Sequence, residues 1–417
     1  MTTALVAPDR PAHRDPNLLR WLAAYAASMA GDGVYYIALS WAAVQAGTPA
    51  QAGLVMSASA LPRAVLMLGG GVIADRLGPR RVVIGSDAVR CAAVLAVAAL
   101  LFVTGLGLWP LAALALVFGT VDAVFVPAVG ALPARITDKA QLARVQGMRG
   151  LAYRFAVILG APLGGLAVAF GGAVAAFGTA GLLIAVSIPL LISVRVRELP
   201  PDDRAADGTT TDGTTTPWRD LAAGLHYIRR HRVLAPLMLA IALGDLGFTG
   251  PLNVGLTLLA DERGWGAAGM GWVLAGFGVG AGTASTVLTV RGRLPHAGRS
   301  AGGSLVAGCV AIGALAYVPG VLAAVGIALL IGLLAGLSGV LCGALLQTHS
   351  DPACLGRVTA VSSLVSLGLA PLTMPLSAAA IGAWGTGPVF VVSAAVSGLG
   401  GVVALGVRDL RRAELPG

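Results

Sequence analysis

The segment GGGVIADRLGPRRVVIGSDAVR, residues 69–90, connects two long apolar runs, and its middle part, residues 75–81, carries one aspartate and three arginines. The two runs, residues 51–74 and 82–105, each exceed the roughly 20 residues that a helix needs to cross the hydrocarbon core of a bilayer. A dense group of charges is excluded from hydrocarbon. The sequence therefore predicts a helical hairpin whose connection lies at the membrane surface.

The rest of the chain repeats this alternation of apolar runs and polar gaps. Of its 417 residues, 57% are hydrophobic and 11% are charged, whereas a soluble domain has about 25% charged residues. Unpaired backbone groups are too costly in lipid, so the apolar runs are expected to be helices. We therefore predict an all-α polytopic membrane protein with twelve transmembrane helices. Their predicted ranges are 20–45, 51–74, 82–105, 109–133, 147–170, 173–194, 234–259, 267–290, 299–318, 321–347, 356–380 and 385–406.

Basic residues are concentrated on one side of this predicted topology. The gaps after the odd-numbered spans contain one basic residue, Arg263, and the tails and the other gaps contain nearly all the rest. Cytoplasmic loops are enriched in Lys and Arg, so both tails, residues 1–19 and 407–417, are predicted to be cytoplasmic in a multi-pass inner-membrane protein. The same distribution accounts for the net charge of +9, and we expect no nucleic acid as a partner.

The longest gap, residues 195–233, contains the low-complexity stretch PPDDRAADGTTTDGTTTP and is predicted to be a cytoplasmic linker. Its second part predicts an amphipathic helix over about 217–232 that lies on the inner membrane face. The bulky residues at helical spacing are Trp218, Leu221, Leu225 and Ile228.

Several motifs recur at an offset of 213 residues. Since six spans precede the second copy, both copies enter the membrane in the same orientation, as a parallel repeat. The predicted domains are a six-helix half at 20–194 and a second at 234–406. The matched pairs are Gly31-Asp32 with Gly244-Asp245, DKAQLARV at 138–145 with DPACLGRV at 351–358, and Pro162 with Pro375.

The loop between the second and third spans contains a Gly, three residues, Asp-Arg, one residue, a second Gly, Pro79 and two basic residues. This arrangement resembles the cytoplasmic signature of the major facilitator superfamily, which commonly has a basic residue where Pro79 stands. The resemblance implies the major facilitator fold and a loop that latches one conformation of a transporter. The latch positions are Gly71, Asp75, Arg76, Gly78, Arg80 and Arg81.

Further segments resemble the exporter branch of this superfamily that includes enterobactin and macrolide exporters. They are GDGVYYIALSW at 31–41, ALPRAVLMLGGGVIADR at 60–76 and FVPAVGALPARITDKAQLARVQGMRG at 125–150. In the fifth span, LGAPLGGLA at 159–167 resembles the Gly/Pro signature of drug–proton antiporters. The positions that carry it are Gly160, Pro162, Gly164 and Gly165.

These resemblances imply a monomeric secondary active transporter that exchanges protons for a small lipophilic compound, antibiotic or siderophore-like product. A proton-coupled importer of a small polar solute is the first alternative, and a membrane sensor without transport is the second. No spacing suited to a metal site or to a catalytic nucleophile and base occurs in the sequence. We therefore expect no metal, no cofactor and no enzymatic activity.

Three acids lie near the middle of predicted spans, namely Asp32, Asp122 and Asp245. A charged residue at the bilayer centre costs about 2.5–3.5 kcal/mol on insertion scales, so each acid requires a partner or a proton. The functional interpretation is that Asp32, with Asp122 or Asp245, alternates between protonated and ionised forms during transport. The alternative is a static ion pair of Asp32 or Asp122 with Arg63, which lies at similar depth.

Helices 1, 4, 7 and 10 line the central cavity in this superfamily, so side chains near the acids are candidates for contact with a substrate. Helix packing explains aromatic side chains at such places equally well. The candidates are Tyr35, Tyr36, Trp41, Phe248 and Asn253.

Overall fold

The computed structural model describes residues 14–105, 107–137, 141–196, 217–291, 296–351 and 354–414, and within these ranges every regular element is a helix. The first group of helices is built from long apolar segments with defined starts. Asp15 accepts a hydrogen bond from the backbone N–H of Asn17 and so caps the first helix, and Thr48 forms a capping box with Gln51 at the second. The group comprises α1 (Pro16–Ala46), α2 (Pro49–Leu77), α3 (Pro79–Thr104), α4 (Leu108–Ile136) and α5 (Leu142–Ser193).

Glycine permits two sharp changes of direction in this group. Gly78, between α2 and α3, has a φ of 84°, which side-chain-bearing residues rarely adopt. Within α5 the backbone leaves the helical region at Gly171 and at Gly172, whose φ is 67°. The element α5 is therefore two helices, 142–170 and 173–193, that meet at this break.

The second group begins after the linker, with one helix interrupted in its middle. The helix predicted over 234–259 consists of α8 (Leu234–Gly250), a π-helical turn η3 (Pro251–Gly255) and α9 (Leu256–Glu262). Pro251 removes a backbone donor at the interruption, which favours the local change of hydrogen bonding. The other elements are α7 (Pro217–Arg230), α10 (Gly266–Arg291), α11 (Ala297–Leu315), α12 (Val321–His349), α13 (Leu355–Trp384), α14 (Thr386–Gly406) and α15 (Arg408–Arg411).

Helix ends in the two groups recur at the offset seen in the sequence. Both ends of α12 lie 213 residues after the corresponding ends of α4. The same difference separates residues 173–193 of α5 from α14. The division of the chain into two folding units of six helices stays a prediction.

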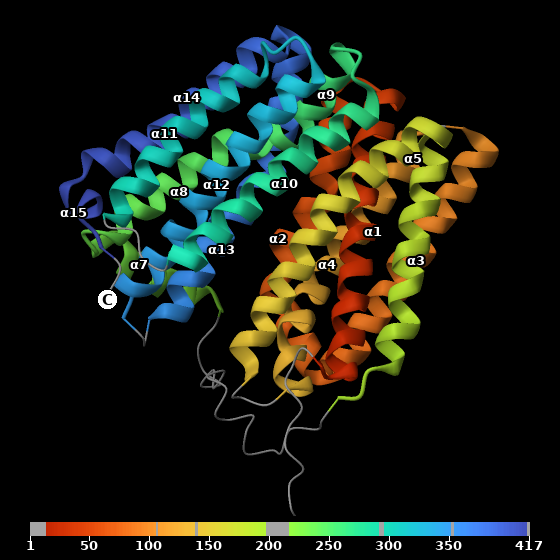
Figure 1. The fold of residues 1–417 in the computed structure, drawn as a ribbon, viewed down its shortest axis with the longest axis horizontal. Coiled ribbons are helices and arrows are strands. Elements are labelled where there is room, and N and C mark those ends of the chain that lie inside the picture. Colours follow the sequence, from red (N-terminus) through yellow and green to blue (C-terminus); the bar gives the residue numbers. More distant parts are fainter. Residues whose placement is uncertain are drawn as a thin grey trace, which may run out of the picture.

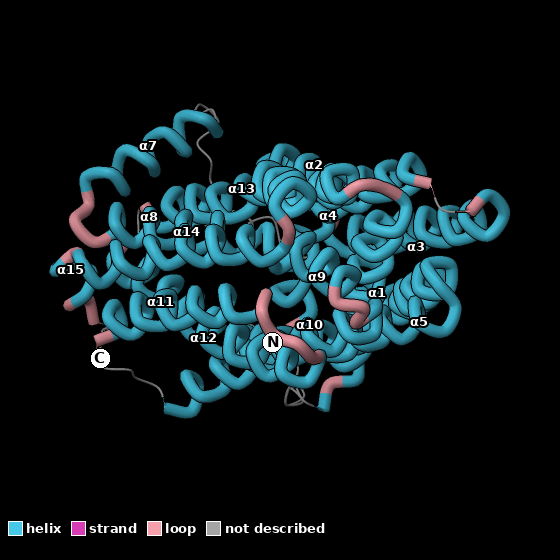
Figure 2. The backbone as a smooth tube through the Cα atoms, turned by 90° about the horizontal axis from the view of Figure 1, so that it is seen from above, coloured by secondary structure: helices cyan, strands magenta, loops and turns pink. Residues whose placement is uncertain are grey.

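The two groups lie close together near α9 and separate toward the end that carries α7 (Figure 1). Their main contacts are α5 with α10 and α2 with α13. Seen from above, α7 lies at the outer edge of the second group (Figure 2), where it packs against α13. The side chains of Trp218 and Leu221 lie outside the described residues.

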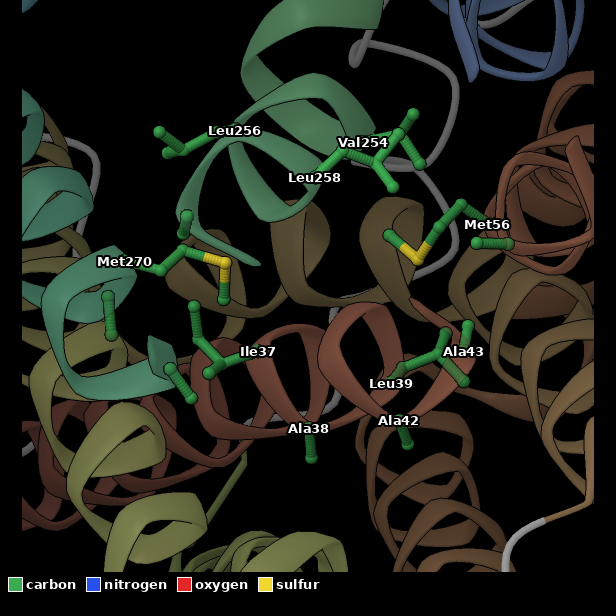
Figure 3. Close-up of a cluster of buried hydrophobic side chains, with 14 of the residues drawn as sticks. Ile37, Ala38, Leu39, Ala42, Ala43, Met56, Val254, Leu256, Leu258 and Met270 are labelled. Atoms are coloured by element: carbon green, nitrogen blue, oxygen red, sulfur yellow. The ribbon is translucent and has the colours of Figure 1, made fainter. Parts of the chain in front are cut away.

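A cluster of buried apolar side chains joins the groups at the α9 end (Figure 3). Ile37 and Leu39 of α1 and Met56 of α2 meet Leu256 of α9 and Met270 of α10 in this cluster. Burial of such side chains is the main favourable contribution to packing where water is excluded. The cluster closes one end of the space between the groups.

Nine helical segments among the described residues are long and apolar enough to cross a membrane, counting Arg144–Ser193 once and Leu234–Glu262 once. Side chains on the outside of the bundle are apolar as well, for example Phe102, Phe170 and Leu322, each at least 80% exposed. Such exposure is costly in water but suits contact with lipid.

Candidate functional site

A cavity of about 690 Å³ lies between the two groups. Helices α1, α2, α4 and α5 form its walls on one side, and η3, α9 and α10 form them on the other. Its charged lining residues, Asp32, Arg63, Asp122 and Arg149, all come from the first group. Most other lining side chains are apolar or aromatic, including Met29, Tyr36, Phe125, Tyr153, Met270 and Phe277.

The guanidinium of Arg90 on α3 is the centre of a buried charge network beside this cavity. Arg90 is fully buried and donates from Nη1 to Asp32 Oδ2 on α1 at 2.7 Å. The same nitrogen lies 3.4 Å from Asp122 Oδ1 on α4. Arg90 Nη2 donates to Asp87, one turn earlier on α3. One planar guanidinium thus binds carboxylates from three helices, which only arginine can do with directed donors.

Asp87 is held from behind by two serines. Ser28 Oγ on α1 donates to Asp87 Oδ1 at 3.0 Å, and Ser187 Oγ in the second part of α5 donates to Asp87 Oδ2 at 2.5 Å. Ser28 Oγ also accepts from Arg90 Nη2 at 3.1 Å. Asp87 is fully buried and fully bonded, so its arrangement fixes the position of Arg90.

A second arginine reaches the network from α2. Arg63 Nη1 lies 3.5 Å from Asp122 Oδ2 and 3.5 Å from the hydroxyl of Tyr36. The Arg63 side chain is 29% exposed, so water in the cavity weakens this pair relative to those of Arg90.

Arg90 also makes a cation–π contact. Its guanidinium carbon lies 3.9 Å from the centre of the Phe125 ring.

The network contains more acids than bases. Asp32, Asp87 and Asp122 face two guanidinium groups, those of Arg90 and Arg63. Moreover, Asp32 Oδ1 is buried without a hydrogen-bond partner among the described residues. A buried carboxylate oxygen without a donor is unfavourable, and one bound proton removes the deficit of positive charge.

Asp245 on α8 lies in a different setting. It lines a separate pocket of about 190 Å³ within the second group and accepts from Ser366 Oγ on α13 at 2.5 Å. It makes no ion pair with another described residue. The two symmetry-related acids therefore differ, because only Asp32 meets an arginine.

The predicted substrate contacts occupy several places. Tyr36 and Asn253 line the main cavity, and Phe248 lines the pocket of Asp245. Tyr35 is fully buried and stacks on Phe118 with ring centres 3.6 Å apart. Trp41 packs on the apolar cluster.

The glycines of the fifth span lie at crowded helix contacts. A Cβ at Gly160 would lie 3.0 Å from Ala30 O, and one at Gly164 would lie 3.1 Å from Val34 Cα, both on α1. A Cβ at Gly165 would lie 2.5 Å from Ala267 O on α10. Pro162 lies inside the helix between them. Small residues at these positions let α5 approach α1 and α10 closely.

The latch motif is described in part. Arg80 donates from Nη2 to Ile192 O at 2.6 Å, so it binds the free carbonyls at the end of α5. Arg76 and Arg81 are exposed. The surroundings of Gly71 and the side chain of Asp75 lie outside the described residues.

Arg90 and Asp87 were not among the site residues predicted from the sequence. The signal for them was present, because they are three residues apart inside one apolar span and so share a helix face. Charged groups at that spacing in a span are expected to point inward together. In the structure Arg90 takes the position beside Asp32, and Arg63 pairs with Asp122.

The comparisons with known proteins agree with this architecture. A family model described as Major Facilitator Superfamily matches residues 21–369. The multidrug efflux pump Tap of Mycobacterium tuberculosis (strain ATCC 25618 / H37Rv) is 26% identical over 421 residues, covering 97% of this chain and 96% of that protein. The enterobactin exporter EntS of Shigella boydii serotype 18 (strain CDC 3083-94 / BS512) is 27% identical over 363 residues, covering 84% and 80%.

Solved structures share the fold at low sequence identity. The nucleoside transporter NupG superimposes with a TM-score of 0.71 at 12% identity and covers 94% of this chain and 99% of its own. A D-xylose-proton symporter has a TM-score of 0.68 at 13% identity and covers 94% and 97%. Since the family model matches most of the chain, the protein belongs to the Major Facilitator Superfamily and is a multi-pass membrane transporter of a small molecule rather than an enzyme.

Proposed function

We propose that this transporter exports small amphiphilic compounds in exchange for protons. The observation that carries the proposal is the buried network at the cavity wall, in which three carboxylates share two guanidinium groups and Asp32 Oδ1 has no partner among the described residues. Such a network binds one proton with a gain in charge balance. The proton is bound by the coupled network as a whole and is not assigned to one residue.

The coupling follows from the position of Asp32. When Asp32 is ionised, it holds Arg90 at 2.7 Å and presents a carboxylate to the cavity. When Asp32 is protonated, Arg90 keeps Asp87 and Asp122 as partners, and α1 loses its ionic bond to α3. A cationic or strongly polar substrate favours the ionised form and a proton favours the neutral form. Competition of this kind at one cavity produces exchange.

The cavity lining supports an amphiphilic substrate. Apolar and aromatic side chains dominate the surface, and methionines can adapt to different shapes. Tyr36, Tyr153 and Asn253 supply a few polar groups for orientation. The relatives named as a multidrug efflux pump and an enterobactin exporter support export of such compounds.

Several features of the transport cycle belong to the same proposal. Both termini and the linker would face the cytoplasm, and the space between the groups would open on that side. Two six-helix halves, 20–194 and 234–406, would rock about the site as a monomer. The loop with Arg76, Gly78 and Arg80 would hold one of the end states.

Everted membrane vesicles containing the protein test the proposal directly. An acid interior should drive uptake of a fluorescent lipophilic cation such as ethidium, and ethidium should dissipate the proton gradient measured by a pH-sensitive dye. Import would instead appear as proton and solute moving in the same direction. Absence of any solute-dependent proton flux across a panel of cationic, neutral and anionic amphiphiles would leave the sensor alternative.

A further inference from the structure

The second helix group contains a pocket that the transport site does not use. It measures about 190 Å³ and is lined by residues of α8, α11, α12 and α14. Asp245 is the only carboxylate in its lining among the described residues. The remaining polar lining groups are the hydroxyls of Ser304, Ser338 and Ser397 and the thiol of Cys342.

The repeat explains why the pocket is open. At the offset of 213 residues shared by α4 and α12, Asp122 corresponds to Ala335 and Phe125 to Ser338. Both replacements remove volume from the region next to the acid of α8. Ala335 and Ser338 line the pocket, whereas Asp122 and Phe125 both contact the guanidinium of Arg90.

The arginine itself has no counterpart. Helix α3 places Arg90 against Asp32, whereas α11 contributes Ser304, Leu305 and Gly308 to the pocket beside Asp245. No basic residue is among the described residues that line it. The second group thus keeps the acid and leaves space where the first group holds a cation.

Several oxygen atoms around this pocket are available to accept a further hydrogen bond or to ligate a cation. Asp245 Oδ2 accepts from Ser366, and Oδ1 has no bond with another described residue. Ser397 is 4% exposed, lines the pocket and has no hydrogen-bond partner in the described part of the chain. Ser304 and Ser338 donate to carbonyls of their own helices, so their lone pairs remain available as acceptors.

We infer that this pocket binds an alkali-metal cation, with part of its water shell, as the replacement for the missing arginine. One carboxylate balances one positive charge, so a divalent ion would leave excess charge inside the membrane. Carboxylate and hydroxyl oxygens are ligands that hard cations prefer, and thiolate-binding metals would require more than Cys342. The pocket is large enough for the ion together with water, which completes its coordination.

Thermal unfolding of the purified full-length protein in detergent tests the inference without reference to transport. The melting temperature is compared in LiCl, NaCl and KCl and in N-methylglucamine chloride at equal ionic strength. A bound ion should raise Tm by about 2 °C or more in at least one alkali salt, saturating with concentration. Asp245→Asn should abolish the rise, and Ser397→Ala should weaken the apparent affinity several-fold without preventing folding. Asp409→Asn, which removes an exposed carboxylate from α15, should leave the rise unchanged.

Three outcomes would overturn the inference. The first is equal Tm in all four salts, which means that water and a proton fill the pocket. The second is an alkali-dependent rise that survives Asp245→Asn. The third is a rise in Tm for Ser397→Ala that shows the same apparent affinity for the cation as the wild type. Because none of these readouts involves a transported compound, failure of this inference leaves the proposed proton exchange standing, and the reverse also holds.

Discussion

Arg90 Nη1 on α3 lies 2.7 Å from Asp32 Oδ2 on α1, and Arg90 is fully buried. This contact joins two helices in the interior of the first group and lies at the wall of the main cavity. The dependence is one-sided, because Asp32 would be uncompensated in a medium of low dielectric constant without Arg90, whereas Arg90 would keep Asp87 and Asp122. The pair therefore links the packing of the helices to the ionisation state of the cavity.

Replacement of Arg90 by Gln should destabilise the protein more than any other single change in the network. It leaves Asp32, Asp87 and Asp122 without their shared guanidinium, and breaking buried ion pairs costs about 3–5 kcal/mol. Arg90→Lys should be intermediate, because an ammonium keeps the charge but lacks the planar set of donors. The melting temperature in detergent measures both effects. An equal fall in melting temperature for Arg81→Gln, at an exposed site, would contradict the importance of the buried contacts of Arg90.

Arg63→Gln should be much milder. Asp122 keeps Arg90 as a partner at 3.4 Å, and the Arg63 pair is longer and partly solvated. Pairs of this kind contribute about 0–1 kcal/mol. Proton-driven transport should persist with an altered Michaelis constant, since Arg63 lines the cavity. Complete loss of proton coupling in this variant would mean that the proton binds on the Asp122 side of the network and not at Asp32.

Gly271→Ala should disfavour the observed packing of α10 on α5. A Cβ at this position would lie 2.6 Å from Ala161 O, which the backbone cannot relieve without separating the helices. The population should shift away from this conformation, which spin labels on α5 and α10 report as a longer distance distribution by double electron–electron resonance. Gly282→Ala on α10 is the matched control, because, apart from the adjoining backbone of α10, no atom of the described residues lies within 4 Å of its Cβ position. Identical distributions in both variants would contradict the role of this contact.

The start of α8 should loosen in acid. His231 precedes the span, and its Nδ1 accepts the backbone N–H groups of Val233 and Leu234 at 3.2 Å each. Burial and the nearby His349 lower the pKa of His231 below its usual value. Since only the neutral ring accepts, the cap is complete above the ordinary pKa of about 6.5 and is lost as pH falls through the lowered pKa of the folded protein.

Hydrogen exchange at the amides of residues 233 and 234 measures this cap. After correction for intrinsic pH dependence, protection should fall below pH 6.5 or so in the wild type and should be low at every pH in His231→Ala. Protection that does not change with pH in the wild type would show that the imidazole does not hold the helix start.

The fold followed from the sequence because its physical signals are local. Apolar runs and Gly or Pro boundaries predict helices such as 109–133 and 385–406 within a few residues of α4 and α14. The interruption at Pro251–Gly255 was not predicted, because a π-helical turn leaves hydropathy unchanged. The amphipathic pattern at 217–232 corresponds to α7.

The candidate site could be predicted from the sequence only in part, because its interacting side chains come from segments that are distant in the sequence. The depth of Asp32 and Asp122 is visible in the sequence, but the contact of Asp32 with Arg90 depends on the rotation of α3. Periodicity in a segment that is apolar on every side does not define that rotation. For the same reason the sequence made Asp245 equivalent to Asp32, and only the helix packing separates a paired acid from one beside an open pocket.

Proton-driven transport by Asp32→Asn in everted vesicles tests the central claim most directly. Asp261→Asn, on the far end of α9 and hydrogen-bonded to Gln45, is the matched control. Asp32→Asn should still bind ethidium, measured by fluorescence, and exchange it for unlabelled ethidium, but an imposed pH gradient should no longer drive its accumulation. Asp261→Asn should behave as the wild type. Full proton-driven accumulation by Asp32→Asn would contradict the account and leave the Asp32–Arg90 pair as a structural link only.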